Sequence, residues 1–327
     1  MTMTPLRRLG KTDLQIRQIS LGSVGLTTDS LHREQGIAVV ERALELGVNY
    51  IDTAPFYGDS QSVVGQALQG HNEPYILGTK CGRWTFVDGP YRDLDAIKSQ
   101  FEQTLTELRR DRVDILYIHE ADWIAWWKDM KIPRHTKWIS QDESYDFAGA
   151  PVTQFLNWAR QQNLTTYLGI SGNNADLLAK VLREHPISFD VVLCAFQYSL
   201  IWRNAPRQLL PLTRELDVGV VLGAPLQQGR LAVPHTQWLD DRPEWMDEDL
   251  QTRFARLYNI HQRSESTLAQ LGLRFLLADD RVATIPCGAA SIAELEENME
   301  AAAAGPLPKY LRDQIEPLGK VVAARQG

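Results

Sequence analysis

Short apolar segments rich in β-branched residues alternate along the chain with longer segments whose apolar residues recur at helical spacing. The first kind predicts strands at residues 18–24, 48–53, 75–80, 113–120, 165–172, 189–199, 218–225 and 282–288. The second kind predicts helices at residues 33–47, from about 60, and at 95–110, 152–163, 175–185, 207–216, 249–279 and 291–303, with a polar helix from about 309.

This alternation predicts the fold class. Strands that alternate with helices form a parallel sheet, and eight such units imply a closed (β/α)8 barrel, the TIM barrel of the α/β class. No linker or change of composition interrupts residues 1–327, so we expect one barrel domain. Two long segments, about residues 121–150 and 229–248, directly follow predicted strands. We therefore expect both at the carboxyl-terminal face, where barrel enzymes build their sites.

Composition and charge exclude several classes of function. Of the 327 residues 44% are apolar and 23% are charged, and the net charge is −7 with both signs scattered. This balance argues against a nucleic-acid or anionic-membrane partner. Cys81, Cys194 and Cys287 have neither zinc-site spacing nor the even number of a disulfide framework. With no signal peptide or membrane span in the pattern and no metal site, we expect a cytoplasmic enzyme for small molecules.

Four chemically active side chains stand at the ends of consecutive predicted strands. Asp52 ends the second strand and Tyr57 follows it, Lys80 ends the third, and His119 lies at the end of the fourth. Taken singly, Asp52 is more often a strand-end cap, Lys80 a surface lysine and His119 a satisfied core histidine. Their shared position at neighbouring strand ends favours a common site.

The chemistry of these four groups is coherent. A tyrosine with an ordinary pKa of about 10 is a poor proton donor at neutral pH, and a neighbouring cation lowers that pKa. Lys80 is the expected cation, Asp52 its ion-pair partner, and His119 a hydrogen-bonding group for a substrate oxygen. Tyr57 is then a general acid and base for a carbonyl or alcohol, which requires a hydride partner.

At this point the sequence resembles the aldo-keto reductases, in which an Asp, Tyr, Lys and His tetrad occurs in this order. The resemblance covers nearly the whole chain and includes RRLGKTDLQIRQISLG, which is similar to the family's opening hairpin and first strand. The motifs GVNYIDTAPFYG, LGTK, VDILYIHE, LGISG, CAFQYS and IPCGAASIAELEEN follow in family order. TKCGR and GVVLGAPLQQGRL are most similar to the L-galactose and L-fucose (D-threo-aldose) dehydrogenases of the family.

The resemblance implies a nicotinamide cofactor and the regions that hold it. The carboxamide is expected near Ser171 and Gln197, the pyrophosphate along residues 226–231 with Arg230 as charge partner, and the adenosine at residues 288–298, on a helix N-terminus. The full set of expected cofactor residues is Gly22, Ser23, Asp52, Ser171, Asn173, Gln197, Ala224, Leu226, Gly229, Arg230, Gly288, Ser291, Glu294, Glu297 and Asn298.

Several positions depart from the family pattern. Gly223 stands where many members stack an aromatic ring on the nicotinamide, and Gly172 precedes Asn173 where many have Asn directly after the serine. Ala290 and Glu294 stand where NADP-using members commonly carry arginine. A carboxylate beside the ribose repels a 2′-phosphate, so NAD is weakly favoured over NADP, although a helix-surface glutamate is an equal alternative.

The substrate side of the expected site is rich in aromatic residues. Trp123, Trp126, Trp127 and Trp138 lie in the first long segment, either as a small satellite core or as an aromatic wall for the C–H faces of a sugar. Trp123 and Trp126 are the substrate-binding candidates of this group, together with Tyr57 and His119. Arg83 and Trp84 are further candidates because they follow Lys80, with a solvent-facing loop arginine as the alternative for Arg83.

Four functions remain open from the sequence. The first is an NAD(P)-dependent oxidoreductase that acts on an aldose or sugar-derived carbonyl. The second is an NADPH-dependent reductase of sugar-derived or xenobiotic aldehydes and ketones. The third is a lyase that uses Lys80 as a Schiff-base lysine, which an adjacent carboxylate disfavours by keeping the amine protonated. The fourth is a non-catalytic cofactor-binding subunit, which the complete tetrad disfavours.

Overall fold

The computed structural model describes residues 4–82, 90–129 and 138–321. Two short antiparallel strands, β1 (Leu6–Arg8) and β2 (Gln15–Arg17), form a hairpin before the barrel. The turn between them contains Gly10 at φ 56°, and a Cβ at this position would approach the backbone of Gly219 to 2.1 Å. The hairpin is thus packed tightly against the end of a barrel strand, and the opening hairpin expected from the resemblance is present.

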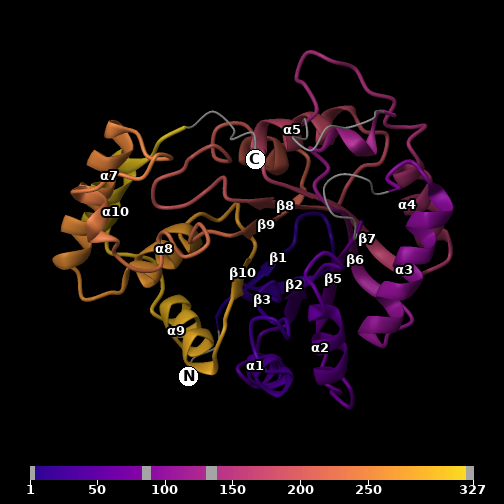
Figure 1. Ribbon diagram of the computed structural model, residues 1–327, viewed down its shortest axis with the longest axis horizontal. Helices are drawn as coiled ribbons and strands as arrows, with labels where there is room; N and C mark the ends of the chain where they lie inside the picture. The colour runs from indigo at the N-terminus through magenta and orange to yellow at the C-terminus, as the bar shows by residue number, and fades with distance from the viewer. Residues whose placement is uncertain (1–3, 83–89, 130–137, 322–327) are drawn as a thin grey trace.

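Eight parallel strands form the barrel in the order β10-β3-β4-β5-β6-β7-β8-β9 (Figure 1). An isolated bridge between Val221 of β9 and Thr284, the residue before β10, joins the two outer strands and nearly closes the barrel. This confirms the predicted (β/α)8 barrel. The strands are β3 (Ile19–Gly22), β4 (Tyr50–Asp52), β5 (Ile76–Cys81), β6 (Val113–Ile118), β7 (Thr165–Gly172), β8 (Val191–Ala195), β9 (Gly219–Gly223) and β10 (Ile285–Gly288).

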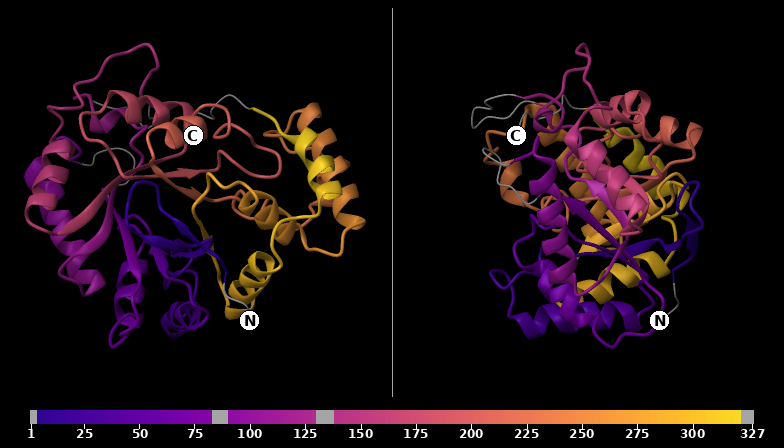
Figure 2. Two further views of the ribbon diagram at one scale, coloured as in Figure 1. Left: turned by 180° about the vertical axis from the view of Figure 1, so that it is seen from behind. Right: turned by 90° about the vertical axis from the view of Figure 1, so that its right-hand side faces the viewer.

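Helices follow the strands and surround the sheet (Figures 1 and 2). The predicted helical segment 249–279 divides into two helices at Thr267, whose side chain caps the second one in a capping box with Gln270. The helices are α1 (Arg33–Glu45), α2 (Ser60–Ala67), α3 (Leu94–Leu108), α4 (Pro151–Gln161), α5 (Ala175–Glu184), α6 (Leu209–Glu215), α7 (Glu248–Gln262), α8 (Leu268–Leu277), α9 (Ile292–Ala303) and α10 (Lys309–Ile315).

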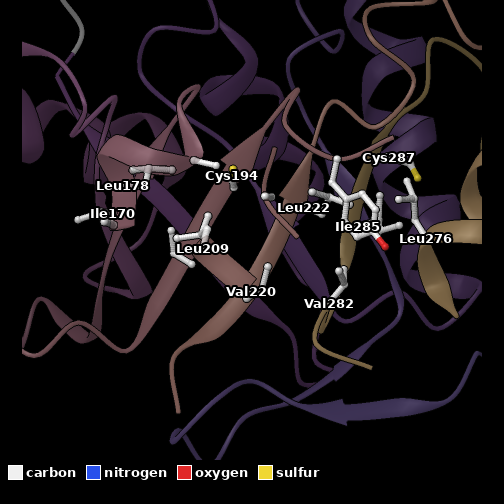
Figure 3. Packing of buried hydrophobic residues seen from close by; sticks show 14 of the residues in the cluster. Ile170, Leu178, Cys194, Leu209, Val220, Leu222, Leu276, Val282, Ile285 and Cys287 are labelled. Atoms are coloured by element: carbon white, nitrogen blue, oxygen red, sulfur yellow. The ribbon is translucent and has the colours of Figure 1, made fainter. Parts of the chain in front are cut away.

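The core has two layers because alternate residues of each strand face opposite sides of the sheet. On β9, Val221 belongs to the cluster inside the barrel, whereas Val220 and Leu222 pack in the layer between sheet and helices. Figure 3 shows Val220 and Leu222 in this outer layer together with Leu209 of α6 and Leu276 of α8. Helices α3, α4, α5, α6 and α9 contact strands of the sheet and cover the outside of the barrel.

One predicted strand is longer than the observed one. The pattern predicts a strand over 189–199, but β8 ends at Ala195 because Phe196 adopts a left-handed backbone conformation with φ 65°. The backbone N–H of Phe196 then donates to the carbonyl of Gly223 at 3.2 Å, and the side chain of Gln227 donates to the carbonyl of Phe196 at 2.8 Å. These contacts turn the chain across the barrel end.

Candidate active site

Three neighbouring strands position the four candidate catalytic side chains. Asp52 is the last residue of β4, Lys80 is the penultimate residue of β5, and His119 directly follows β6. The register aligns Asp52 with Gly78 and Lys80 with Tyr117. The carboxyl ends of these parallel strands therefore bring the side chains to one end of the barrel, and Tyr57 reaches the same place from the loop after β4.

Lys80 and Asp52 form a buried ion pair. The Lys80 Nζ donates to Asp52 Oδ2 at 2.7 Å and to the carbonyl of Thr53 at 2.9 Å. The Lys80 side chain is only 1% exposed. Burial by itself lowers the pKa of Lys80, but the Asp52 carboxylate and its hydrogen bond more than offset this effect, so the pKa is raised and the ammonium is retained.

Tyr57 lies beside this cation. The Lys80 Nζ is 5.0 Å from the centroid of the Tyr57 ring. Burial raises the pKa of Tyr57 and the charge of Lys80 lowers it, and the net shift is upward. Lys80 therefore acts in the expected direction, but the expected net lowering of the pKa is wrong, because desolvation of the phenolate outweighs its attraction to Lys80. Tyr57 is held in its protonated form.

His119 completes the group as a neutral imidazole. Its ring is 5.9 Å from the ring of Tyr57 and 5.9 Å from that of Phe56, edge-on to both. Burial and the charge of Lys80 lower the pKa of His119 to about 3. At neutral pH the ring therefore contributes one hydrogen-bond donor and one acceptor and no charge.

Two tyrosines below the ion pair were missed by the sequence reasoning. Tyr50 donates to Asp52 Oδ1 at 3.3 Å, and its hydroxyl lies 3.0 Å from that of Tyr117. Their rings need the space left by Gly78 and Gly169, where a Cβ would approach them to 2.5 Å. Each tyrosine lies two positions before Asp52 or His119, so the period-two rule for one face of a strand was the available signal.

A pocket opens next to His119. It is lined by Phe56, Gly82, Tyr91, His119, Glu120, Trp123 and Trp126. Of the substrate candidates, His119, Trp123 and Trp126 line this pocket and Tyr57 is not among its lining residues, whereas Arg83 and Trp84 fall outside the described residues. Glu120 and Tyr91 were not singled out from the sequence, although Glu120 directly follows His119.

Some tryptophans of the first long segment line the pocket, and others form the small satellite core that was the alternative interpretation. Trp126 Nε1 donates to the carbonyl of His119 at 2.8 Å, and its ring is 4.8 Å from that of Tyr91. Trp127 instead packs against Phe147 with ring centroids 4.7 Å apart. Trp138 forms a backbone bridge with Trp123. One part of the group therefore lines the pocket, and another part is a satellite core that fastens the segment.

The carboxylate of Asp122, in the first long segment, explains why glycine stands at position 172, where the sequence departs from the family pattern. Asp122 Oδ2 accepts the backbone N–H groups of Asn173 at 2.7 Å and Asn174 at 2.8 Å. A Cβ on Gly172 would come within 2.6 Å of Asp122 Oδ1, so no larger residue fits there. Ser171 is fixed as well, because its Oγ accepts the N–H of Glu120 at 3.3 Å and donates to the carbonyl of Ile118 at 3.2 Å.

The remaining carboxamide candidate lies next to this turn. β7 and β8 are paired so that Gly172 aligns with Cys194, and Gln197 follows on the next loop. Gln197 Oε1 accepts the N–H of Ala175 at 3.5 Å. Gly223 of β9 packs closely against β8, since a Cβ at this position would lie 3.1 Å from the side chain of Leu193. The structure thus groups Ser171, Asn173 and Gln197 at adjacent strand ends.

The loop after β9 carries the pyrophosphate candidates. Ala224, Gln227, Gln228 and Gly229 all have positive φ values, of 48°, 55°, 53° and 90°. Arg230 follows, and its guanidinium carbon lies 4.9 Å from the ring centroid of Trp245 in the second long segment. Within residues 4–82, 90–129 and 138–321 this guanidinium has no carboxylate partner, so its charge is available to an anion. Leu226 of the same loop packs toward Gly272 of α8.

The last strand–helix turn holds the adenosine candidates. Gly22 pairs with Gly288 on one side and with Asp52 on the other, and the N–H of Ser23 donates to the carbonyl of Asp52 at 3.0 Å. Ser291 is the N-cap of α9 and accepts the N–H of Glu294 at 3.2 Å. The Glu294 carboxylate in turn accepts the N–H of Ala290 at 2.8 Å. Glu294 therefore has a capping role in addition to any role toward a ribose.

Two further candidates lie on the same helix. Glu297 accepts the hydroxyl of Thr267 at 2.7 Å, which ties α9 to the start of α8. Asn298 is buried on the inner face of α9.

In the part of the chain that is described, no helix is long and apolar enough to cross a membrane, and no three His, Cys, Asp or Glu side chains are grouped as metal ligands.

Comparison with known proteins identifies what this arrangement resembles. The family model described as "Aldo/keto reductase family" matches residues 18–320. The chain is 27% identical to an Arabidopsis thaliana L-galactose dehydrogenase, over 92% of this chain and 89% of the other. It is 25% identical to a Pseudomonas D-threo-aldose 1-dehydrogenase, over 86% and 87%. The solved structure of the holo form of aldo-keto reductase AKR11C1 from Bacillus halodurans superposes with a TM-score of 0.74, at 25% identity and 98% coverage of both chains.

Proposed function

The chain belongs to the aldo/keto reductase family and is an oxidoreductase, and from this premise we propose that it interconverts a carbonyl and an alcohol on an aldose or a sugar-derived substrate. The observation that carries the proposal is the juxtaposition of Tyr57 with the Lys80–Asp52 ion pair and with a neutral His119, which lines an aromatic pocket. The similarity to two sugar dehydrogenases supports the substrate class.

The described residues fit a nicotinamide dinucleotide. Arg230, which has no carboxylate partner within the described ranges and is stacked on Trp245, suits a pyrophosphate. The Ser291 N-cap of α9, with the Glu294 carboxylate beside it, suits the hydroxyl groups of the adenosine ribose. Ser171, Asn173 and Gln197 carry donors and acceptors suited to a carboxamide. When bound, the cofactor supplies or takes up the hydride.

The residues of this chain then handle the proton. In the reductive direction, the substrate oxygen is bound between the Tyr57 hydroxyl and the neutral His119 ring, which lie edge-on to each other. Tyr57, kept protonated by burial, transfers its proton to that oxygen, and the Lys80 ammonium stabilises the phenolate that forms. Oxidation follows the reverse path. The Schiff-base alternative is disfavoured, because Lys80 is paired with Asp52 at 2.7 Å and is almost fully buried.

We further propose NAD as the preferred cofactor. Glu294 places a carboxylate at the adenosine candidates, and its hydrogen bond to the N–H of Ala290 fixes the carboxylate there. A 2′-phosphate would be repelled by this charge, whereas a 2′-hydroxyl can donate to it.

The first experiment is a matrix of NAD and NADP against a panel of aldoses and simple aldehydes, followed by the absorbance of the reduced nicotinamide. Turnover with NAD and one aldose configuration supports the proposal. Turnover only with NADPH and aldehydes makes the enzyme a carbonyl reductase and contradicts the argument from Glu294. Cofactor binding without turnover of any substrate would favour a non-catalytic subunit.

The proton-transfer role is tested with Tyr57→Phe. The variant lacks only the hydroxyl, so we expect turnover to fall by about 100-fold or more while the dissociation constant for the cofactor changes little. The matched control is Tyr310→Phe, which removes a hydroxyl from an exposed tyrosine on α10. Near-normal turnover in Tyr57→Phe would contradict the mechanism.

A further inference from the structure

The wall of the pocket next to His119 carries a carboxylate with an unusual backbone. Glu120 has φ 54°, in the left-handed region that residues other than glycine rarely adopt. This conformation occurs directly after His119, where β6 has ended, and Glu120 lines the pocket. Strained backbone at such a position points to a functional requirement for the side-chain direction.

The Glu120 side chain is anchored through one oxygen only. Oε1 accepts the side-chain amide N–H of Asn173 at 2.9 Å, and the backbone N–H of Glu120 donates to Ser171 Oγ at 3.3 Å. Oε2 has no hydrogen-bond partner within residues 4–82, 90–129 and 138–321. The carboxylate is therefore held in place by β7 while one of its oxygens stays available to a ligand.

Glu120 sets the charge of the described pocket. The other lining residues are aromatic, apart from Gly82, and His119 is neutral. The nearby Lys80 is buried and directed at Asp52, and the Asp122 carboxylate is directed at backbone N–H groups. A substrate in this pocket therefore meets aromatic faces and one negatively charged acceptor.

We propose that Glu120 is a specificity-determining residue, which accepts a hydrogen bond from a hydroxyl of the substrate and selects neutral polyhydroxylated carbonyls over carboxylated or phosphorylated ones. Aromatic faces match the C–H surfaces of a sugar, and a fixed carboxylate matches its hydroxyl groups. The same carboxylate repels an anionic substituent placed beside it. This inference rests on the proposed function and extends it to the substrate class.

The test compares wild type, Glu120→Gln and the exposed control Glu73→Gln on three substrates. These are the aldohexose that wild type turns over best, the uronic acid of the same configuration, and benzaldehyde, which has no hydroxyl. We expect wild type to prefer the aldohexose to the uronic acid at least ten-fold. Glu120→Gln should lower kcat/KM for the aldohexose about ten-fold, mainly through KM, and leave benzaldehyde within about two-fold. The preference over the uronic acid should also shrink, while Glu73→Gln matches wild type.

Three results overturn the proposal. Equal losses on all three substrates in Glu120→Gln assign the residue a structural role. A wild-type preference for the uronic acid means that the carboxylate of Glu120 does not set the charge that the substrate meets. Turnover of no carbonyl at all defeats the proposed function, and this inference with it. If Glu120→Gln does not fold, Glu120→Asp replaces it, and it should keep discrimination against the uronic acid while losing affinity for the aldohexose.

Discussion

At the scale of single residues, the site is built around one buried charge. Lys80 is among the largest fully buried side chains of the described chain, and three groups surround its ammonium: the carboxylate of Asp52, the carbonyl of Thr53 and the ring of Tyr57. Burying an ammonium costs several kcal/mol unless it is paired, so the ion pair serves stability and chemistry together. The two roles can be separated by mutation.

Lys80→Met should destabilise the protein by about 3 to 5 kcal/mol and abolish most turnover, because it leaves Asp52 buried without its partner. The double variant Asp52→Asn/Lys80→Met removes both charges, so it should recover much of the stability and none of the activity. Denaturant unfolding and steady-state rates measure the two effects. A double variant as unstable as Lys80→Met would mean that the unpaired charge on Asp52 is not the cause of the destabilisation.

At the scale of elements, the connections between strands and helices hold the site together more than the helices themselves do. The turn after β6 binds the turn after β7 through Glu120 and Asp122, and α5 begins directly behind Asn174, its N-cap. At the far end of α5, His185 Nδ1 accepts the N–H of Ile187 at 3.0 Å, and Nε2 lies 3.0 Å from the hydroxyl of Thr153 on α4. This arrangement requires the neutral ring, which joins α4 to α5.

This histidine predicts a pH dependence of stability. Burial lowers the pKa of His185 from 6.5 to about 4. Between these values the unfolded chain binds a proton that the folded chain does not, so stability is full above pH 6.5 and falls as the pH drops toward 4. The expected loss from this residue is about 2 to 3 kcal/mol.

Unfolding free energies of wild type and His185→Gln at several pH values between 7 and 4.5 measure this effect. The variant should lose less stability over the window, whereas His71→Gln, at a half-exposed histidine, serves as the matched control. Burial raises the pKa of Asp122 to about 7, so protonation of Asp122 stabilises the folded protein as the pH falls. This contribution is the same in wild type and in both variants. Parallel curves for wild type and His185→Gln would contradict the assignment.

At the scale of the whole molecule, the two ends of the barrel have separate tasks. The N-terminal hairpin packs its Leu9 and Ile16 side chains into the cluster inside the barrel. Arg7 of the hairpin donates to the carbonyl of Leu277, the last residue of α8, at 2.7 Å and to that of Asp279, just beyond α8, at 3.0 Å. The beginning of the chain thereby fastens a segment that lies some 270 positions later. The other end of the barrel carries the pocket and the catalytic residues.

Leu9→Ala should therefore lower the free energy of unfolding by about 2 to 5 kcal/mol, because it empties a fully buried site that is in contact with Gly219. The KM and kcat of the folded enzyme should stay within about two-fold of wild type, since the substitution is at the closed end. Leu6→Ala, at an exposed leucine of the same hairpin, is the control. A large change in KM without a change in stability would contradict this separation of tasks.

The sequence by itself determined the barrel and the location of its site. The periods of 2 and 3.6 in the apolar residues are local properties, so the order of strands and helices could be read directly. Because parallel strands point in one direction, residues at their carboxyl ends lie at the same end of the barrel, and this alone places Asp52, Lys80 and His119 together.

Only the tertiary structure decided the features that depend on contacts between distant segments. The direction of the Tyr57 pKa shift depends on how deeply the loop is buried relative to its distance from Lys80. The early end of β8 depends on Phe196, whose left-handed backbone is fixed by Gly223 and Gln227. The roles of Glu120 and Gly172 depend on the contact between the turn after β6 and the turn after β7. Desolvation, close packing and hydrogen-bond geometry depend on contacts between residues that are distant in the sequence, so the pattern of apolar and polar residues does not predict them.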